Sequence, residues 1–176
     1  MIFEEPKFNP GGDRFIEMEL GDEMSFDLNF LVHSVSGLIR ESRTKGIIEI
    51  VPELTSIMIS YDFEQIGYGD VVQEMTALFH ALGPLDDLEL DSRMFYLPIH
   101  YFDEWTRGCY EDYCAKISEK EWDPQVLVRL NGLSGLDQLA QVHSGTDYWV
   151  AALGFYPGLV SLMPLDPRCR LTAPKY

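Results

Sequence analysis

The first half of the chain carries clear hydrophobic patterns. Residues 14–20 alternate, with apolar Ile16, Met18 and Leu20 on one side and mostly acidic residues on the other, before Gly21. A two-residue period of this kind is typical of a strand with one buried face. The pattern therefore predicts a strand over 14–20.

A helix is predicted directly after this strand. Ser25 occupies the position of a helix N-cap, and Asp27 falls in the first turn, where an acidic side chain is favourable. Apolar residues then recur at intervals of three and four, which gives a helix one buried face. These residues are Leu28, Leu31, Val32, Val35, Leu38 and Ile39.

Two further strands and a second helix follow. Residues 47–51 are nearly all β-branched, and residues 56–61 alternate in polarity. The four residues between them, 52–55, suit a hairpin connection. Residues 71–82 return to helical spacing and stop at Gly83-Pro84, which is a strong signal for the end of a helix.

The order of these elements predicts an α+β fold. A further strand is expected over 94–102, which completes the series strand, helix, strand, strand, helix, strand. With or without this last strand, the order favours a ferredoxin-like domain, which we place at residues 1–91. The pattern weakens in residues 92–176, where we expect a second domain.

Three short helical segments and one strand are expected in this second domain. The helical segments lie within 105–120, 124–130 and 136–142, and the strand covers 148–155. Small residues in that strand allow close packing. No internal repeat and no low-complexity tract is present in the sequence.

Charge narrows the range of partners. The 176 residues contain 13 Lys and Arg and 29 Asp and Glu, so the formal net charge is 13 − 29 = −16. Nucleic acids and anionic membrane surfaces would be repelled, and no basic run offsets this charge. We therefore expect neither nucleic acid nor membrane as a partner, and a basic protein surface is easier to reconcile with the sequence.

The sequence also bears on location. The three cysteines are an odd and sparse set, which indicates reduced thiols rather than a disulfide framework. The N-terminus lacks the features of a signal peptide, and no apolar run approaches the length of a membrane span. We therefore expect a soluble, cytoplasmic protein.

One candidate for chemistry is the adjacent pair His143 and Ser144, followed by Thr146 and Asp147. A serine, a histidine and an acid are the components of a nucleophile–base arrangement. Adjacent side chains rarely point at one another, however, so a triad would need a distant base. Binding of a substrate by His143, or capping of helix carbonyls by it, are the two interpretations that remain open.

A second candidate is a group of metal-ligand types: His100, Asp103, Cys109 and Cys114. The Cys-x4-Cys spacing with one nearby histidine is not a standard zinc pattern. We therefore predict no metal site and interpret the two cysteines as small buried hydrophobic residues.

A third candidate is the segment from Gly154 to Gly158, which reads Gly-Phe-Tyr-Pro-Gly. It lacks the lysine and the glycine spacing of a phosphate-binding loop. It instead predicts a strand that ends in aromatic residues and turns sharply at Pro157-Gly158. Phe155 and Tyr156 could wall a pocket or contact a partner, although a simple core strand and turn would explain the same residues.

Taken in order, these residues resemble a known family. His143-Ser144, Tyr148, Gly154-Phe155, Pro157-Gly158 and the run 165–168 (Leu-Asp-Pro-Arg) match the group that contains KipI, allophanate hydrolase subunit 1 and the B subunit of 5-oxoprolinase. This family also supplies part of the carboxyltransferase domain (subdomains C and D) of urea carboxylases. The opening residues 12–14 and 21–22, and residues 49–52 and 61–62, look like other parts of the same family.

The resemblance implies more than the spacing does. It implies that residues 92–176 begin a cyclophilin-like β-barrel, and that the chain works with a KipA-type partner, similar to the C subunit of 5-oxoprolinase. Together the two would form a cleft for a small amide, urea-like or oxoproline substrate. Members act in carboxyl transfer from carboxybiotin, in ATP-dependent ring opening of oxoproline, or as a regulator that inhibits a sensor histidine kinase.

We therefore expect one component of a carboxyltransferase or ATP-dependent amide hydrolase complex that is inactive alone. His143 and Ser144 are its predicted catalytic residues, and its predicted substrate-binding residues are Tyr148, Gly154, Phe155, Pro157 and Gly158. ATP or carboxybiotin would belong to the complex, because the sequence has neither a Walker motif nor a biotinyl-lysine motif. A non-catalytic regulator of a histidine kinase is the alternative, followed by a stand-alone structural module.

Three departures from the family pattern qualify this expectation. The family usually continues from Pro-Gly as Phe-Pro-Tyr-Leu, whereas here Gly158 is followed by Leu-Val-Ser-Leu, so the aromatic pair that would build a pocket is missing. The segment 104–128 is longer and more acidic than is usual. The chain also stops at Tyr176, before the strands that close the barrel, so we expect either a fragment or a domain that another chain completes.

Overall fold

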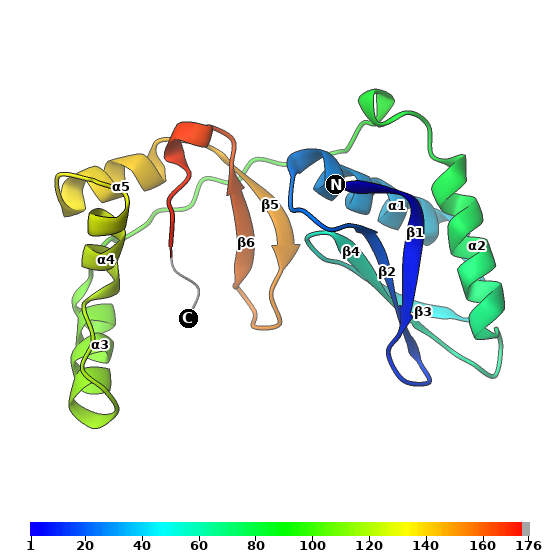
Figure 1. Ribbon diagram of the computed structural model, residues 1–176, viewed down its shortest axis with the longest axis horizontal. Coiled ribbons are helices and arrows are strands. Elements are labelled where there is room, and N and C mark those ends of the chain that lie inside the picture. The colour runs from blue at the N-terminus through cyan, green and yellow to red at the C-terminus, as the bar shows by residue number, and fades with distance from the viewer. Residues whose placement is uncertain (174–176) are drawn as a thin grey trace. The chain divides into compact units, whose positions relative to one another are not determined.

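The structure, a computed structural model, describes residues 1–173 and contains six strands, five α-helices and two short 3-10 helices there (Figure 1). It confirms a mixed α/β class with antiparallel sheets. The elements are β1 (Ile2–Pro10), β2 (Phe15–Gly21), α1 (Phe26–Ser42), β3 (Ile47–Pro52), β4 (Ser56–Tyr61), α2 (Tyr68–Ala81), η1 (Leu85–Asp87), α3 (Glu104–Lys116), α4 (Asp123–Leu130), α5 (Leu136–Ser144), β5 (Tyr148–Leu153), β6 (Val160–Pro164) and η2 (Pro167–Cys169).

The chain divides into two compact units. The first, here called the sheet unit, comprises residues 1–93 and 151–161, and the second, the helical unit, comprises residues 94–150 and 162–176. The helical unit is described as far as residue 173. The division into domains at residue 91 that the sequence suggested stays a prediction.

The sheet unit is built on four antiparallel strands in the order β1-β2-β4-β3. The inward side chains of β2 and β4, including Ile16, Met18 and Ile59, are fully buried with residues of α1 and α2. The alternation of apolar and polar residues in 14–20 therefore has the predicted cause, because one face of the sheet packs against the hydrophobic core. Ser25 caps α1 as predicted, since its hydroxyl accepts a hydrogen bond from the backbone N–H of Leu28 at 3.1 Å.

One expectation about the strands is wrong, and one strand was missed. Residues 94–102 form no strand, and the apolar side chains of residues 94–99 are exposed, with Tyr96 at 86% and Leu97 at 78%. Strand β1 pairs with β2, and the sequence pattern missed this strand. Strand β1 contains Pro6 and Pro10 and pairs on one side only, and prolines are tolerated on such an edge because they cannot donate to a second neighbour.

The predicted helical segments of the second half are present as α3, α4 and α5. Strands β5 and β6 pair in a two-stranded sheet. Within residues 1–173 no helix is both long enough and apolar enough to cross a bilayer; α1, the longest, has 17 residues.

Candidate functional site

His143 lies in the last turn of α5 and is held by two tyrosines. The hydroxyl of Tyr101 and Nδ1 of His143 are 2.7 Å apart and share a hydrogen bond. The hydroxyl of Tyr148 donates to the backbone carbonyl of His143 at 2.6 Å. Both phenol rings also contact the imidazole, with centroid separations of 5.7 Å for Tyr101 and 5.5 Å for Tyr148. The ring of His143 is therefore fixed in direction.

The second ring nitrogen is the chemically interesting atom. Within residues 1–173, Nε2 of His143 has no hydrogen-bond partner, and the side chain is only half-buried. A neutral imidazole has one donor and one acceptor nitrogen, and the partner of one decides the role of the other. If Tyr101 donates to Nδ1, then Nε2 carries the proton and can donate to an incoming oxygen.

Tyr148 is suited to remain a neutral donor beside His143. Burial raises the pKa of its phenol above the ordinary value, and the neighbouring Cys169 and Tyr101 act in the same direction. Removing water from a phenol disfavours the charged phenolate, so the proton stays on the oxygen that binds the backbone of His143. The loss of that proton would break the 2.6 Å contact.

Ser144 is not paired with His143. Its hydroxyl donates to the carbonyl of Ala140 one turn earlier in α5, at 2.8 Å, which is a common contact for a helical serine. Nδ1 of His143 meets a phenol, whereas the acid member of a Ser-His-acid triad would meet that nitrogen with a carboxylate. This geometry does not favour nucleophilic catalysis by Ser144, and its catalytic role stays a prediction.

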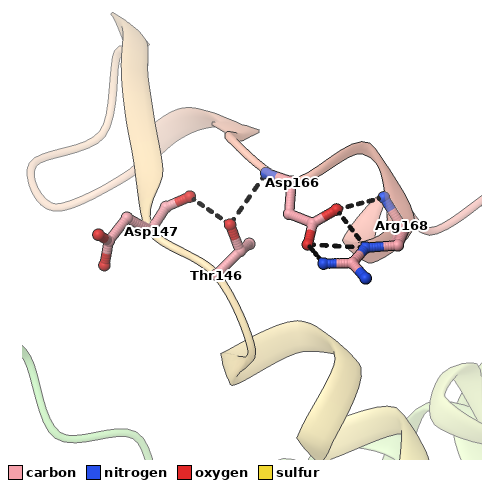
Figure 2. A network of polar contacts seen from close by, with 4 residues as sticks. All are labelled: Thr146, Asp147, Asp166 and Arg168. Carbon is pink, nitrogen blue, oxygen red and sulfur yellow. Dashed lines mark hydrogen bonds and ion pairs between the residues drawn. The ribbon is translucent and has the colours of Figure 1, made fainter.

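The residues between α5 and β5 are tied to the residues after β6 (Figure 2). The hydroxyl of Thr146 accepts a hydrogen bond from the backbone N–H of Asp166 at 3.0 Å, and Leu165 N–H donates to the carbonyl of Asp147 at 2.9 Å. The carboxylate of Asp166 in turn accepts bonds from the backbone N–H and the guanidinium of Arg168. These contacts hold the two ends of the hairpin together, so this part of the 165–168 run has a structural role.

The guanidinium of Arg168 also sets the charge of this network. Its hydrogen bonds and positive charge lower the pKa of Asp166, and the carboxylate raises the pKa of Arg168 in return. Both side chains are therefore ionised near neutral pH. The positive charge of Arg168 is satisfied by Asp166, so it does not make this turn an anion site.

The loop from Gly154 to Leu159 is compact and exposes its aromatic residues. Leu159 N–H donates to the carbonyl of Tyr156 at 3.0 Å, and Gly158 has a φ of +83°, which fits a type II turn with proline before glycine. A Cβ on Gly154 would lie 2.9 Å from the end of the Leu159 side chain, so a larger residue there would displace that side chain. Phe155 is 87% exposed and stacks on Tyr156 at a centroid distance of 4.2 Å.

The same hairpin segment is held to α1 of the sheet unit. The buried amide of Asn29 donates to the carbonyls of Leu54 and Ala151, each at 3.1 Å. Nε2 of His33 lies 3.0 Å from the same carbonyl of Ala151. Two polar side chains, one turn apart on α1, therefore bind one backbone oxygen of β5, a contact that the hydrophobic pattern could not reveal.

The four metal-ligand types do not form a site in the described part of the chain. No group of three or more His, Cys, Asp or Glu side chains there is placed to hold a metal ion. Asp103 caps α3 instead, where its carboxylate accepts from the backbone N–H groups of Trp105 and Thr106. The interpretation of Cys109 as buried is wrong, because it is exposed, and Cys114 is only partly covered.

The geometry defines a mixed α/β protein with two antiparallel sheets and a histidine held by two tyrosines. Comparison with known proteins then places it: residues 6–176 match the family described as the carboxyltransferase domain, subdomain C and D, and the chain belongs to that family. This confirms the resemblance drawn from His143 to Pro167.

Individual relatives agree with this assignment. Urea amidolyase of Saccharomyces cerevisiae is 26% identical over 175 residues, covering 96% of this chain and 10% of that protein. The B subunit of 5-oxoprolinase from Bacillus subtilis is 24% identical over 173 residues, covering 93% of this chain and 64% of that protein. The crystal structure of the K. lactis urea amidolyase shares the fold with a TM-score of 0.86 at 20% identity, over all of this chain and 11% of that one. The chain thus spans about a tenth of the urea amidolyases that it matches.

Proposed function

We propose that this chain is a component of a carboxyltransferase-type amide hydrolase, in which His143 binds a carbonyl or carboxylate oxygen of the substrate. The observation that carries the proposal is the fixed imidazole, with Tyr101 on Nδ1 and no partner for Nε2 among the described residues. Relatedness to urea amidolyase and to the B subunit of 5-oxoprolinase supports this class of activity.

The two tyrosines explain why His143 would act as a hydrogen-bond donor to the substrate. A phenol is a good donor to an imidazole nitrogen, so Tyr101 favours the tautomer with its proton on Nε2. A positioned N–H can stabilise negative charge that develops on an oxygen in the transition state, and this is often the largest catalytic effect. Tyr148 supports the same group from the backbone side. Tyr101 and Tyr148 thus act as positioning residues for His143.

The remaining predicted residues keep subordinate roles. Ser144 is proposed as an acceptor for a substrate amide, because its proton is engaged by Ala140 while its lone pairs are available. Gly154, Phe155, Pro157 and Gly158 are proposed to shape a wall of the substrate site, supported by the order in which they match the family. The substrate would be a small amide, urea-like molecule or oxoproline.

We also propose a fold for each of the two domains. The sheet order β1-β2-β4-β3 with two helices is compatible with a ferredoxin-like domain in which an N-terminal strand takes the edge position. We assign that domain to residues 1–91. The β5–β6 hairpin, in residues 92–176, is proposed as the start of a cyclophilin-like barrel.

We propose a partner and cofactors for the assembled complex, not for this chain alone. A KipA-type protein would complete the substrate cleft. ATP would be bound elsewhere in the complex, because the groups around His143 are one imidazole and two phenols, which do not fit a triphosphate. Carboxybiotin would be carried by the complex and not by this chain alone. No step of the proposed chemistry is assigned to either molecule in this chain.

The test uses the assembled complex of this chain with its KipA-type partner. His143→Ala is expected to abolish turnover of urea, allophanate or oxoproline while the complex still forms, because the positioned donor is lost. Tyr101→Phe, which removes one hydroxyl, should lower kcat while KM changes less. His80→Ala is the matched control, since His80 is exposed on α2 and its Nε2 is paired with the carboxylate of Glu5. Unchanged turnover in His143→Ala would contradict the assignment.

A non-catalytic regulator of a sensor histidine kinase is the second candidate. The exposed, stacked pair Phe155 and Tyr156 favours it, because large exposed aromatics are typical of protein-binding surfaces. In this case Phe155→Ala would weaken kinase binding at least about tenfold, as truncation of an interface hot spot does. Replacement of His143 would then have no effect on kinase inhibition, which separates the two candidates.

A further inference from the structure

The helical unit contains an aromatic pocket. Its lining residues include neither His143 nor the two tyrosines that hold His143. It has a volume of about 340 Å³ and lies between α3, the start of α4 and the loop that joins them. Its aromatic walls come from Phe102, Tyr110, Tyr113 and Trp122. This volume falls within the range of about 300–1,000 Å³ that is usual for small-molecule sites.

The walls are held in place by specific contacts. Tyr110 donates its hydroxyl proton to the carbonyl of Lys120 at 2.8 Å, which fastens the loop to α3. The ring of Phe102 meets that of Trp122 edge to face at a centroid distance of 5.9 Å. Phe102 has a φ of +56°, a costly conformation for a bulky residue, and such strained positions cluster at ligand sites.

Charged groups around the pocket already satisfy one another. The ammonium of Lys120 contacts both carboxylate oxygens of Asp123 at 2.8 Å. The guanidinium of Arg107 lies over the Trp122 ring and is paired with Glu111 at 3.0 Å. These pairs leave no net charge on the wall for a strongly ionic ligand, so an uncharged group is the better fit.

One polar group remains available. Trp122 is only 8% exposed, and its ring contacts are with Phe102 and Arg107. Its indole N–H donates to no acceptor among residues 1–173. The indole nitrogen is not fully enclosed, so water or the acceptor of an entering ligand can reach it.

We propose that this pocket binds a small, uncharged aromatic molecule that carries a hydrogen-bond acceptor. The ring would stack among the tyrosines and Phe102, and the acceptor would bind the indole N–H of Trp122. The site is distinct from the group around His143 and does not depend on the proposed catalytic role of that group.

Benzamide is the probe, because it joins a phenyl ring to a carbonyl acceptor. The chain has three tryptophans, so their indole N–H signals can be followed separately by NMR. Benzamide is expected to shift the Trp122 signal to saturation, with a Kd of about 1 mM for a ligand of this size. Tyr113→Ala should weaken binding about fivefold through the lost ring contact. Trp105→Ala is the control, because Trp105 is 69% exposed on the same helix and does not line the pocket.

Two further measurements keep the test decisive if Tyr113→Ala fails to fold. Benzamide should slow alkylation of Cys109, which lines the pocket, by N-ethylmaleimide, and should leave Cys169 unprotected. Cyclohexanecarboxamide, which lacks the aromatic ring, should bind more weakly than benzamide.

Three results would overturn the proposal. These are a Trp122 signal that does not saturate, equal shifts of Trp105 and Trp122, and equal protection of the two cysteines. Tighter binding of N-acetyl-phenylalaninamide than of benzamide would also overturn it, because the ring would then belong to the side chain of a partner protein.

Discussion

The sheet unit and the helical unit are stabilised in different ways. In the sheet unit, thirteen apolar side chains form one buried cluster, and ten of them are completely enclosed. In the helical unit, as far as residue 173, the buried apolar side chains are Trp122, Val126, Leu139 and Met163, each between 4% and 8% exposed. The sheet unit therefore has a continuous hydrophobic core, whereas the helical unit does not.

Directional contacts take the place of a large core in the helical unit. Tyr101, Tyr148 and Thr146 make the hydrogen bonds that define the region around His143. Burial is non-directional and tolerates small shifts, whereas hydrogen bonds fix distance and angle. The comparison teaches that the unit with the smaller core is the one that fixes the candidate catalytic group.

The largest expected effect comes from a substitution that opens a cavity in each unit. Ile59→Ala, at a fully enclosed position, is expected to cost about 2–5 kcal/mol, and Leu139→Ala about 2 kcal/mol, because its surroundings can relax more. All three tryptophans lie in residues 105–149, so their fluorescence reports on the helical unit alone. In urea titrations, Ile59→Ala should move the circular dichroism midpoint more than the fluorescence midpoint, and Leu139→Ala should do the reverse. Equal shifts of both signals would show that the two units unfold as one.

A second prediction concerns the directional contact within the sheet unit. Asn29→Ala removes the amide that binds the carbonyls of Leu54 and Ala151, and is expected to cost about 1–3 kcal/mol because buried carbonyls lose their donor. Ser36→Ala is the matched control: Ser36 is equally buried on α1, but its hydroxyl donates to Val32 of the same helix. Urea denaturation measures both changes. Equal costs would mean that the link to Ala151 adds nothing.

Much of the sheet unit was predictable because its elements each bury one face. Residues 56–61 alternate and α1 has apolar spacings of three and four, so each pattern reports a contact with the same core. Strand β1 was not predictable in this way, since its prolines and polar residues reflect an edge position. Residues 94–102 have strand-like composition but lack a strand beside them, and composition cannot supply a partner.

The candidate site was predictable only in part. His143 was a candidate from its residue type and its neighbours, and its ordered match with a family gave it a role; periodicity did not reveal it. Tyr101 was missed, because it lies 42 residues before His143 and inside a segment that was expected to be a strand. The only signal in the sequence was the presence of a tyrosine, which can donate a hydrogen bond, near the end of the predicted strand. Contacts of this range depend on the tertiary fold, which local patterns do not encode.

The smallest expected effect concerns the pKa values of two carboxylates, one in each unit. The pKa of Asp166 is lowered mainly by hydrogen bonds from Arg168, while that of Asp62 is lowered mainly by neutral donors, the Gln65 amide and the Glu64 N–H. Because both folded values lie below the ordinary 3.8, each group contributes stability above that value and loses it as pH falls through the folded pKa.

Salt should separate the two carboxylates. Raising ionic strength from 0.1 M to 1 M shortens the screening length from about 10 Å to about 3 Å, which weakens attraction between charges more than bonds from neutral donors. The pKa of Asp166 should therefore rise toward 3.8, whereas that of Asp62 should move less. NMR titration of the two carboxyl carbons measures both, with Arg168→Gln as the control that should remove most of the salt dependence at Asp166. A larger salt response at Asp62 would show that charge plays no special part in the turn beside His143, and that its geometry rests on neutral hydrogen bonds alone.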